Sequence, residues 1–244
     1  MTKAYADLHL LPNVKDNKKV LEMVSKASEL GYRLVALTFP QNFFEEDIQQ
    51  LRMKCQEYAV DLVSRVDLNP KTPKELIRNL RVYRRKFEVL AVLCESKSVA
   101  RQAAKDRRVD LLNFPAFHHA KRFFDIAEAE LASKSLASLE IDINPILRLE
   151  GTARIRLIAS LRRETLIAKK FDVPIVISSG VSDVRLMRKP KEQAALASLF
   201  DLDEASAIQA VSKNPVAIVN RNREKLNPKF VAPGIRIIRW GKDC

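Results

Sequence analysis

The sequence predicts an α/β fold, a TIM-like barrel of about seven parallel strands with extra C-terminal helices. Short apolar runs alternate with amphipathic helical stretches along most of the chain. Several of these runs are nearly continuous in Val, Ile and Leu, as expected for strands covered on both faces. The strand–helix units recur at regular spacing with no large insertion, which favours a closed barrel over an open doubly wound sheet.

The apolar runs and the capping signals place the elements. Thr72 is expected to cap a helix with Pro73 in its first turn, Ser96 or Ser98 to open the next helix, and Gly31 to end an earlier one. The expected strands are Tyr5–Leu10, Arg33–Phe39, Asp61–Leu68, Phe87–Cys94, Val109–Phe114, Ser138–Ile143 and Val173–Ser178. The expected helices are Lys18–Leu30, Glu45–Tyr58, Pro73–Tyr83, Ser98–Asp106 and Lys121–Ser133.

The C-terminal part follows a different pattern. Pro190–Lys225 is expected to be all-helical, with Asn214-Pro215 marking a break between two helices. Ile235–Trp240 is a last short strand candidate, expected to pair at the weak edge of the barrel. No linker or low-complexity tract interrupts the chain, so residues 1–244 are predicted to form a single domain.

Composition narrows the function classes. The 244 residues include 43 Lys and Arg against 30 Asp and Glu, a formal net charge of +13, which favours a nucleic-acid partner. Five glycines and the absence of glycine-rich phosphate-binding motifs disfavour a nucleotide loop. Three scattered cysteines predict neither a disulfide framework nor a zinc ribbon. With no signal peptide or membrane-spanning run visible, we expect a cytoplasmic protein that does not contact a membrane.

Functional residues of such barrels lie at the carboxyl ends of the strands. Asp7 and His9 are two positions apart on one expected strand and point to the same side. A hydrolytic metal site needs several His and carboxylates, but His118 and His119 are adjacent and cannot easily share one face. No nucleophile motif is present, so we predict no catalytic and no metal-binding residues in this chain. The strand-end positions are Asp7, His9, Thr38, Arg65, Asp67, Glu95, Asn113, Asp142, Asn144, Ser178, Ser179 and Gly180.

Basic residues form stripes on two expected helices. Arg156, Arg163 and Lys170 recur every seven positions, and Arg78, Arg81 and Arg85 also share one face. Arginine binds phosphate with two parallel hydrogen bonds, so the set favours a structured polyanion. Because no sequence-reading motif is present, recognition of the backbone and shape of folded RNA is expected.

The stretch Val173-Pro-Ile-Val-Ile-Ser-Ser-Gly180, followed by Arg188-Lys-Pro190 and residues 194–214, resembles the archaeal and eukaryotic ribonuclease P protein component 3 family. The order and spacing of the matching segments extend over roughly residues 5–220. Further matching segments are Tyr5-Ala-Asp-Leu8, Arg107-Arg-Val-Asp110, Phe124-Asp125, Glu140-Ile-Asp142, Asn144-Pro145 and the helix opening with Arg154 and Arg156.

The resemblance implies a barrel related to the polymerase and histidinol phosphatase (PHP) fold, without the metal ligands of that superfamily. Asp7 and His9 stand where metal-dependent relatives carry His-x-His. It also implies a protein subunit of ribonuclease P that supports RNA-catalysed removal of the 5′ leader from precursor tRNA. The resemblance further implies that the catalytic RNA uses Mg²⁺ and that this chain binds no cofactor. The implied partners are ribonuclease P RNA, protein component 2, the other protein subunits and, indirectly, precursor tRNA.

Clustered basic residues in the matching segments are the candidates for RNA contact. The chain would shield phosphate repulsion and hold the RNA in its active shape. The candidate RNA-binding residues are Arg101, Arg107, Lys121, Arg122, Arg154, Arg156, Arg163, Arg185 and Arg188.

Two other functions stay open at this point. One is a metal-dependent phosphoesterase of the PHP superfamily, with Asp7, His9, Glu95, Asp142 and His118 as ligands. The other is a scaffold barrel that binds only protein.

Overall fold

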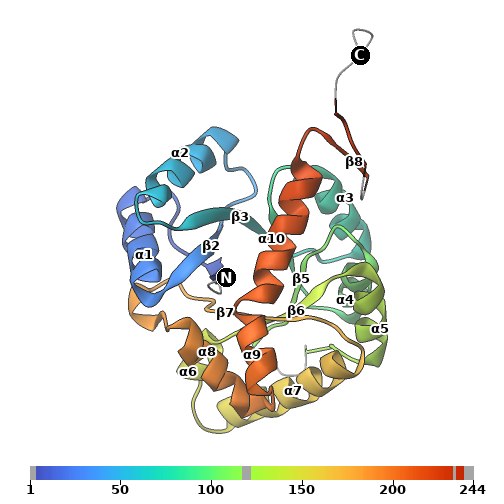
Figure 1. Cartoon of the computed structure of the whole chain (residues 1–244). Coiled ribbons are helices and arrows are strands. Elements are labelled where there is room, and N and C mark those ends of the chain that lie inside the picture. The colour runs from blue at the N-terminus through green and yellow to red at the C-terminus, as the bar shows by residue number, and fades with distance from the viewer. Residues whose placement is uncertain (1–3, 117–121, 233–234, 239–244) are drawn as a thin grey trace.

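The computed structural model describes residues 4–116, 122–232 and 235–238. Seven parallel strands form one sheet in which spatial order follows sequence order (Figure 1). An isolated bridge between Leu10 and Val181 joins the first strand to the segment just after the last strand, so the sheet is a nearly closed barrel and the predicted fold class is confirmed. The strands are β1 (Tyr5–Leu10), β2 (Tyr32–Thr38), β3 (Asp61–Leu68), β4 (Val89–Leu93), β5 (Leu111–Asn113), β6 (Ser138–Asp142) and β7 (Ile175–Ser178).

Helices alternate with the strands and cover the outside of the barrel (Figure 1). The predicted caps at Thr72 and Ser96 are confirmed, since each side chain accepts a backbone N–H of the first turn. Gly31 ends α1 in the left-handed conformation, as predicted. The first seven helices are α1 (Asn17–Leu30), α2 (Glu45–Gln56), α3 (Pro73–Tyr83), α4 (Lys97–Lys105), α5 (Ile126–Ser135), α6 (Asn144–Arg148) and α7 (Gly151–Lys170).

The segment after β7 is helical, as predicted. It comprises the short 3-10 turn η2 (Val184–Leu186), α8 (Pro190–Leu196), the 3-10 turn η3 (Ala197–Phe200), α9 (Glu204–Ala210) and α10 (Lys213–Leu226). Pro215 lies in the first turn of α10, so the break between two helices falls just before Asn214-Pro215 and not at it. A proline fits there because the first-turn N–H groups have no partner within the helix.

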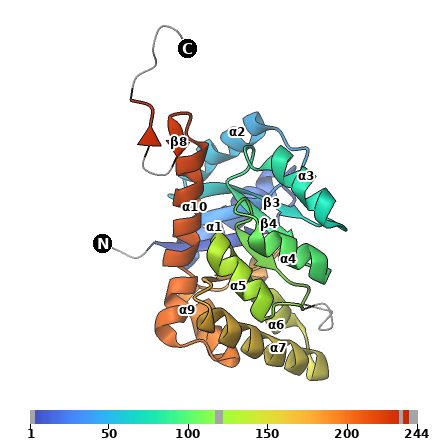
Figure 2. The same cartoon turned by 90° about the vertical axis from the view of Figure 1, so that its right-hand side faces the viewer.

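Helix α10 closes the end of the barrel where the strands begin. It lies across that end in Figure 1 and along one side of the molecule in Figure 2. Its Ile218 and Val219 are buried in one cluster with interior side chains such as Leu8, Leu34 and Val176. Because this end is plugged by apolar packing, only the opposite end of the barrel interior is free to display polar side chains.

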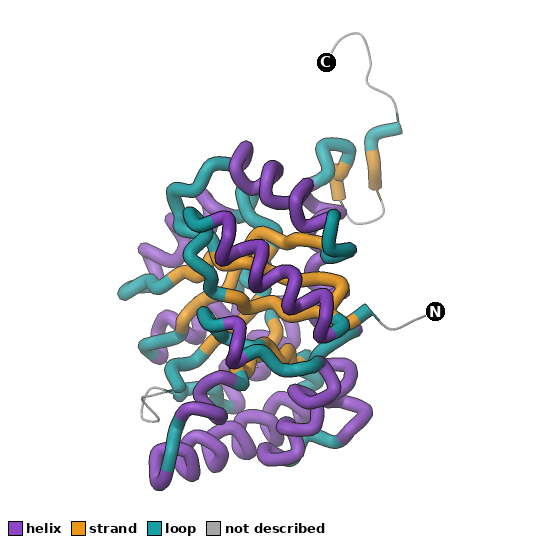
Figure 3. The backbone as a smooth tube through the Cα atoms, turned by 90° about the vertical axis from the view of Figure 1, so that its left-hand side faces the viewer, coloured by secondary structure: helices purple, strands orange, loops and turns teal. Residues whose placement is uncertain are grey.

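Most predicted boundaries lie within two residues of those in the structure, but the start of one helix and the pairing of one strand were predicted wrongly. Helix α5 begins at Ile126 and not at Lys121, because the Asp125 side chain caps it by accepting the N–H groups of Ala127 and Glu128. Ile235–Trp240 does not extend the barrel: β9 (Ile235–Arg236) pairs antiparallel with β8 (Phe230–Ala232) in a separate two-stranded sheet. Figure 3 shows these two short strands apart from the strands of the barrel. Trp240 itself lies outside the described residues.

Within the described ranges, no helix is long and apolar enough to cross a membrane.

Candidate functional site

A buried ion cluster lies inside the barrel toward the carboxyl ends of the strands. The side chain of Arg65 on β3 is fully buried, and its two terminal nitrogens donate to the two carboxylate oxygens of Glu140 on β6 at 2.6 and 2.7 Å. Its Nε donates to Asp67 at 2.7 Å, and Nη1 also donates to the carbonyl oxygen of Leu8. Arg65 thus holds strands β1, β3 and β6 together through one guanidinium.

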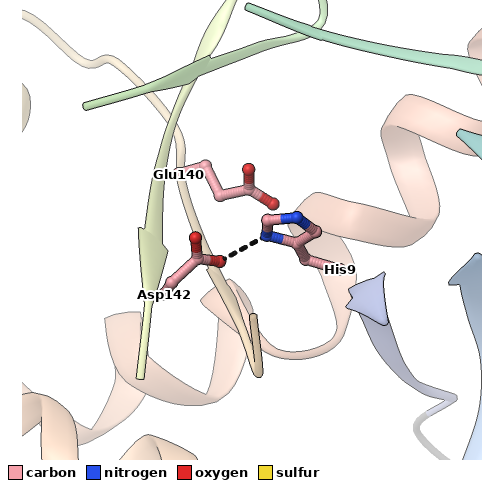
Figure 4. Close-up of side chains that lie close together, drawn as sticks. All are labelled: His9, Glu140 and Asp142. Atoms are coloured by element: carbon pink, nitrogen blue, oxygen red, sulfur yellow. Dashed lines mark hydrogen bonds and ion pairs between the residues drawn. The ribbon is translucent and has the colours of Figure 1, made fainter. Parts of the chain in front are cut away.

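His9 lies between two carboxylates of the same cluster. Its Nδ1 is 2.8 Å from Asp142, drawn in Figure 4, and its Nε2 is 3.1 Å from Asp67. A carboxylate only accepts hydrogen bonds, so both ring nitrogens must carry protons and the ring is an imidazolium. Burial and the Arg65 charge lower the pKa of His9, but Asp142 and Asp67 outweigh them and raise it to about 10.

The acidic partners respond in the opposite direction. Burial alone would raise the pKa of Asp67, but the charges of Arg65 and His9 hold it below its usual range. The pKa of Asp142 is lowered as well, because His9, Arg65 and an amide hydrogen bond from Asn113 outweigh its burial. The cluster therefore consists of buried carboxylates compensated by two cations, the guanidinium of Arg65 and the protonated ring of His9.

Asp7 faces a separate network. Its carboxylate accepts the backbone N–H of Ser179 at 3.0 Å and also the Ser179 hydroxyl. The Ser179 hydroxyl in turn accepts an amide hydrogen bond of 2.6 Å from Gln193. Burial raises the pKa of Asp7 despite these bonds. Asp7 thus links β1 to the segment after β7, at the seam where the barrel closes.

Gly180 brings this seam close to the ion cluster. Its φ is +63°, and a Cβ at this position would lie 2.7 Å from Cγ of Asp142. Its N–H donates to the carbonyl of His9. Glycine is required here both for the left-handed backbone and for the close approach to Asp142.

The fold resembles that of metal-dependent enzymes, so the donor atoms of the cluster decide whether a metal ion could bind here. His9, Glu140 and Asp142 offer ligand atoms within 4.8 Å of one another (Figure 4). However, a metal-binding imidazole must be neutral with a free lone pair, and both nitrogens of His9 face carboxylates. Glu140 already accepts two hydrogen bonds from Arg65, one from Ser178 and one from Asn113. These side chains do not fit a metal ion, because Arg65 and His9 already supply the positive charge.

The structure brings together only part of the predicted strand-end set. The cluster, which lies beneath a cavity of about 460 Å³, brings together His9, Arg65, Asp67, Asn113, Asp142 and Ser178. Glu95, offered as a ligand in the phosphoesterase alternative, instead pairs with Lys71 at 2.8 Å. His118 lies outside the described residues.

Glu140 is the cluster residue that the strand-end reasoning did not single out. It precedes Asp142 by two positions on β6, and so points to the same side. That spacing, together with a lone arginine inside the apolar run Asp61–Leu68 of β3, was the available signal for a buried ion pair.

The candidate RNA-binding residues fall into three groups. Arg107 and Arg156 are exposed, and no partner is recorded for their side chains among the described residues; Arg163 is exposed and donates only to the carbonyl of Arg122. Arg101 and Arg185 form ion pairs at the surface, with Glu128 and Asp125 and with Asp183 respectively. Arg154 and Arg188 donate to backbone carbonyls, and Lys121 lies outside the described residues.

Arg122 requires a correction. Its side chain is 3% exposed and forms a two-pronged pair with Glu164 of α7, while Nη1 donates to the carbonyl of Phe114. A guanidinium held in this way is not presented to a polyanion. Arg122 is therefore a structural residue that anchors the segment before α5 to α7.

Nearly the whole chain aligns with known proteins. It is 31% identical over 229 residues to ribonuclease P protein component 3 of Methanosarcina barkeri, covering 93% of each chain. It is 29% identical to the component 3 protein of Methanosarcina mazei, covering 94% of each. A chain from a cryo-EM structure of archaeal ribonuclease P with mature tRNA superposes with a TM-score of 0.82 at 20% identity, covering 96% of this chain and 99% of that one.

Residues 4–227 also match the family model described as RNase P subunit p30. Nearly every described element, from β1 to α10, falls within that match. The chain therefore belongs to the ribonuclease P subunit p30 family.

Proposed function

We propose that this ribonuclease P subunit supports the RNA-catalysed removal of the 5′ leader from precursor tRNA by binding and stabilising the catalytic RNA. The observation that carries the proposal is the family match over residues 4–227. Curated relatives of similar length carry the name ribonuclease P protein component 3. The chain contributes positive charge and a binding surface, and the RNA catalyses the cleavage of precursor tRNA.

Electrostatics support this division of labour. The net charge of +13 suits a partner whose backbone carries one negative charge per nucleotide. Folding such an RNA compactly brings phosphates together, and bound arginines and lysines reduce their repulsion. Of the candidate residues, Arg107, Arg156 and Arg163 are best placed for this, because they are exposed and in no recorded ion pair among the described residues.

The phosphoesterase alternative is not favoured by the geometry. An ion at the carboxyl end of the barrel would have to displace the guanidinium of Arg65 from Glu140 and remove a proton from His9. We infer that this chain binds no cofactor of its own, and that Mg²⁺ in the assembled enzyme is held by the RNA.

The partners of this chain are then ribonuclease P RNA, protein component 2 and the other protein subunits of the enzyme. We further infer that the chain works in the cytoplasm. Its buried Cys55 and Cys94 are free thiols, which suits a reducing compartment.

Reconstitution tests this function directly. Cleavage of precursor tRNA by ribonuclease P RNA is measured at modest Mg²⁺ with component 2 present, and with this chain added or omitted. The proposal predicts that omission strongly reduces the rate. Equal rates with and without the folded chain would refute it, and manganese-dependent hydrolysis of a phosphomonoester, abolished by His9→Ala, would support the phosphoesterase instead.

A further inference from the structure

Helix α3 presents a row of cations to solvent. Lys74, Arg78 and Arg81 follow one another at intervals of four and three residues, so they lie on one face of the helix and span about 10 Å along its axis. Arg85 continues the row in the turn that follows. All four are exposed, and the opposite face of α3 is buried through Leu76 and Leu80. The row is thus a solvent-facing surface whose position is fixed by packing.

These four cations have no recorded ion-pair partner within the described ranges, and the nearby carboxylates are engaged elsewhere. Glu75 accepts the backbone N–H of Lys71. Asp106 forms a two-pronged pair with Arg108. Glu75 keeps its negative charge in its hydrogen bond with Lys71, but it is the one carboxylate of α3 against three cations, so this face keeps a net positive charge.

The same surface continues onto α10. Arg84 donates to the carbonyl of Arg108, so the turn after α3 touches the segment that carries the exposed Arg107. Arg84 and Arg221 together hold the buried carboxylate of Asp110. Asp110 carries one negative charge against the positive charges of Arg84, Arg221 and the nearby Lys225 of α10.

The pKa of Lys225 reflects this excess of positive charge. Burial and the charges of Arg221, Arg84 and Arg107 lower the pKa of its ammonium group, against the opposite influence of Asp110. Arg221 also has a buried Nε without a hydrogen-bond partner among the described residues. Repulsion among these cations lowers the stability of the fold, and a polyanion bound at this surface would reduce that repulsion.

We propose that the cationic face formed by Lys74, Arg78, Arg81, Arg85, Arg107 and Lys225 is a docking surface for the phosphate backbone of ribonuclease P RNA. The proposal rests on the function proposed above and deepens it by naming the face. Only Arg107 belongs to the candidates chosen from the family segments. The partner is an RNA because an extended row of arginines and lysines matches phosphates and not base edges. The aromatic side chain within the described part of the row, Tyr83, is half-buried and donates to Gln41.

The test compares two triple variants of the full-length chain. The first is Lys74→Ala, Arg78→Ala, Arg81→Ala; the matched control is Lys15→Ala, Lys18→Ala, Lys19→Ala, which removes the same charge from exposed positions at the start of α1. Binding to ribonuclease P RNA, in the presence of component 2, is measured over a series of salt concentrations. Circular dichroism melting confirms that both variants fold.

The α3 variant should bind about tenfold or more weakly at moderate salt, and its plot of log affinity against log salt should lose up to about three units of slope. The control should lose less than about one unit. The same loss in both variants would contradict the proposal, since it would reflect total charge only. An unchanged slope for the α3 variant with weakened assembly onto component 2 would also overturn it, because the face would then serve a protein.

Failure of this inference is distinguishable from failure of the proposed function. If the wild-type chain stimulates precursor tRNA cleavage and the folded α3 variant stimulates it equally at every salt concentration, the function stands and the docking face is wrong. If the wild-type chain itself does not stimulate cleavage, the function is wrong, and the docking face falls with it.

Discussion

The guanidinium of Arg65 and the carboxylate of Glu140 form a two-pronged pair from which solvent is fully excluded, inside the barrel between β3 and β6. Because Arg65 pairs with the carboxylates at this end of the barrel, these acidic residues stabilise the fold and do not form an open acidic site. The counter-charge of these carboxylates is supplied by a side chain of the same protein. The pair joins β3 to β6 across the interior of the barrel.

Replacing Arg65 by Ala should strongly destabilise the fold. Removing one partner of a buried pair leaves an uncompensated charge, with a cost of about 3–5 kcal/mol in the free energy of unfolding. Denaturant unfolding measures it. The double variant Arg65→Met, Glu140→Leu serves as the comparison and should recover much of the loss; an equal or larger loss in the double variant would show that the pair is not the source.

Removal of the guanidinium should also create an affinity for divalent cations. In Arg65→Ala, the carboxylates of Asp67, Glu140 and Asp142 lose their main counter-charge, so Mn²⁺ or Zn²⁺ should raise the melting temperature of this variant. The same ions should leave the wild-type melting temperature unchanged. A clear stabilisation of the wild-type chain would contradict the conclusion that its donor set is already satisfied.

The charge on His9 predicts a pH dependence of stability. Its pKa is raised to about 10 in the folded chain, against 6.5 for an ordinary histidine. The contribution is therefore complete below about pH 6.5, declines as pH rises, and is lost above about pH 10. Within that window the free energy of unfolding should fall by up to about 1.4 kcal/mol per pH unit from this group.

The comparison for that prediction is the variant His9→Gln, measured over the same pH range. Subtracting its profile removes the contributions of lysines and tyrosines, which titrate in both proteins. A difference between wild type and variant that stays constant from pH 6.5 to 10 would mean that His9 is not charged in the folded state.

Gly180→Ala should cost much more than Gly31→Ala. Both glycines have positive φ, but a Cβ at position 31 meets nothing within 4 Å, whereas at position 180 it lies 2.7 Å from Asp142. The difference in the free energy of unfolding should exceed about 1 kcal/mol. Similar costs at the two positions would argue against the close packing of the seam on the ion cluster.

Arg122 and Arg156 should have separable effects. Arg122→Ala breaks the buried pair with Glu164 and should lower stability, with little change in the salt dependence of RNA binding. Arg156→Ala removes an exposed charge and should leave the melting temperature nearly unchanged while it reduces the salt slope by about one unit. The opposite pattern would restore Arg122 as an RNA contact.

The fold was largely predictable because its signals are local. β1 and β3 begin and end at the predicted residues, since turn and helix signals flank continuous apolar runs. The wrong assignment of Ile235–Trp240 has the opposite cause: a short apolar strand does not specify its partner. Pairing with Phe230–Ala232, a few residues away, costs less chain entropy than reaching the barrel edge.

The site was less predictable because its partners are distant in sequence. Glu140 lies 75 positions from Arg65, and Glu164 lies 42 from Arg122. Only the assembled barrel shows that one arginine is buried and another is exposed. The sequence shows that a residue is basic, but it does not show whether an acidic side chain already neutralises that charge in the folded protein.

Whether the chain acts only by stabilising the RNA is tested by single-turnover cleavage of precursor tRNA across a Mg²⁺ titration, with component 2 present and with or without this chain. If the chain only stabilises a catalytic RNA, it should lower the Mg²⁺ concentration needed for half-maximal rate severalfold, and the two curves should converge at saturating Mg²⁺. If the chain instead changes the saturating rate and leaves the half-maximal Mg²⁺ concentration unmoved, it takes part in the reaction itself and the account is wrong.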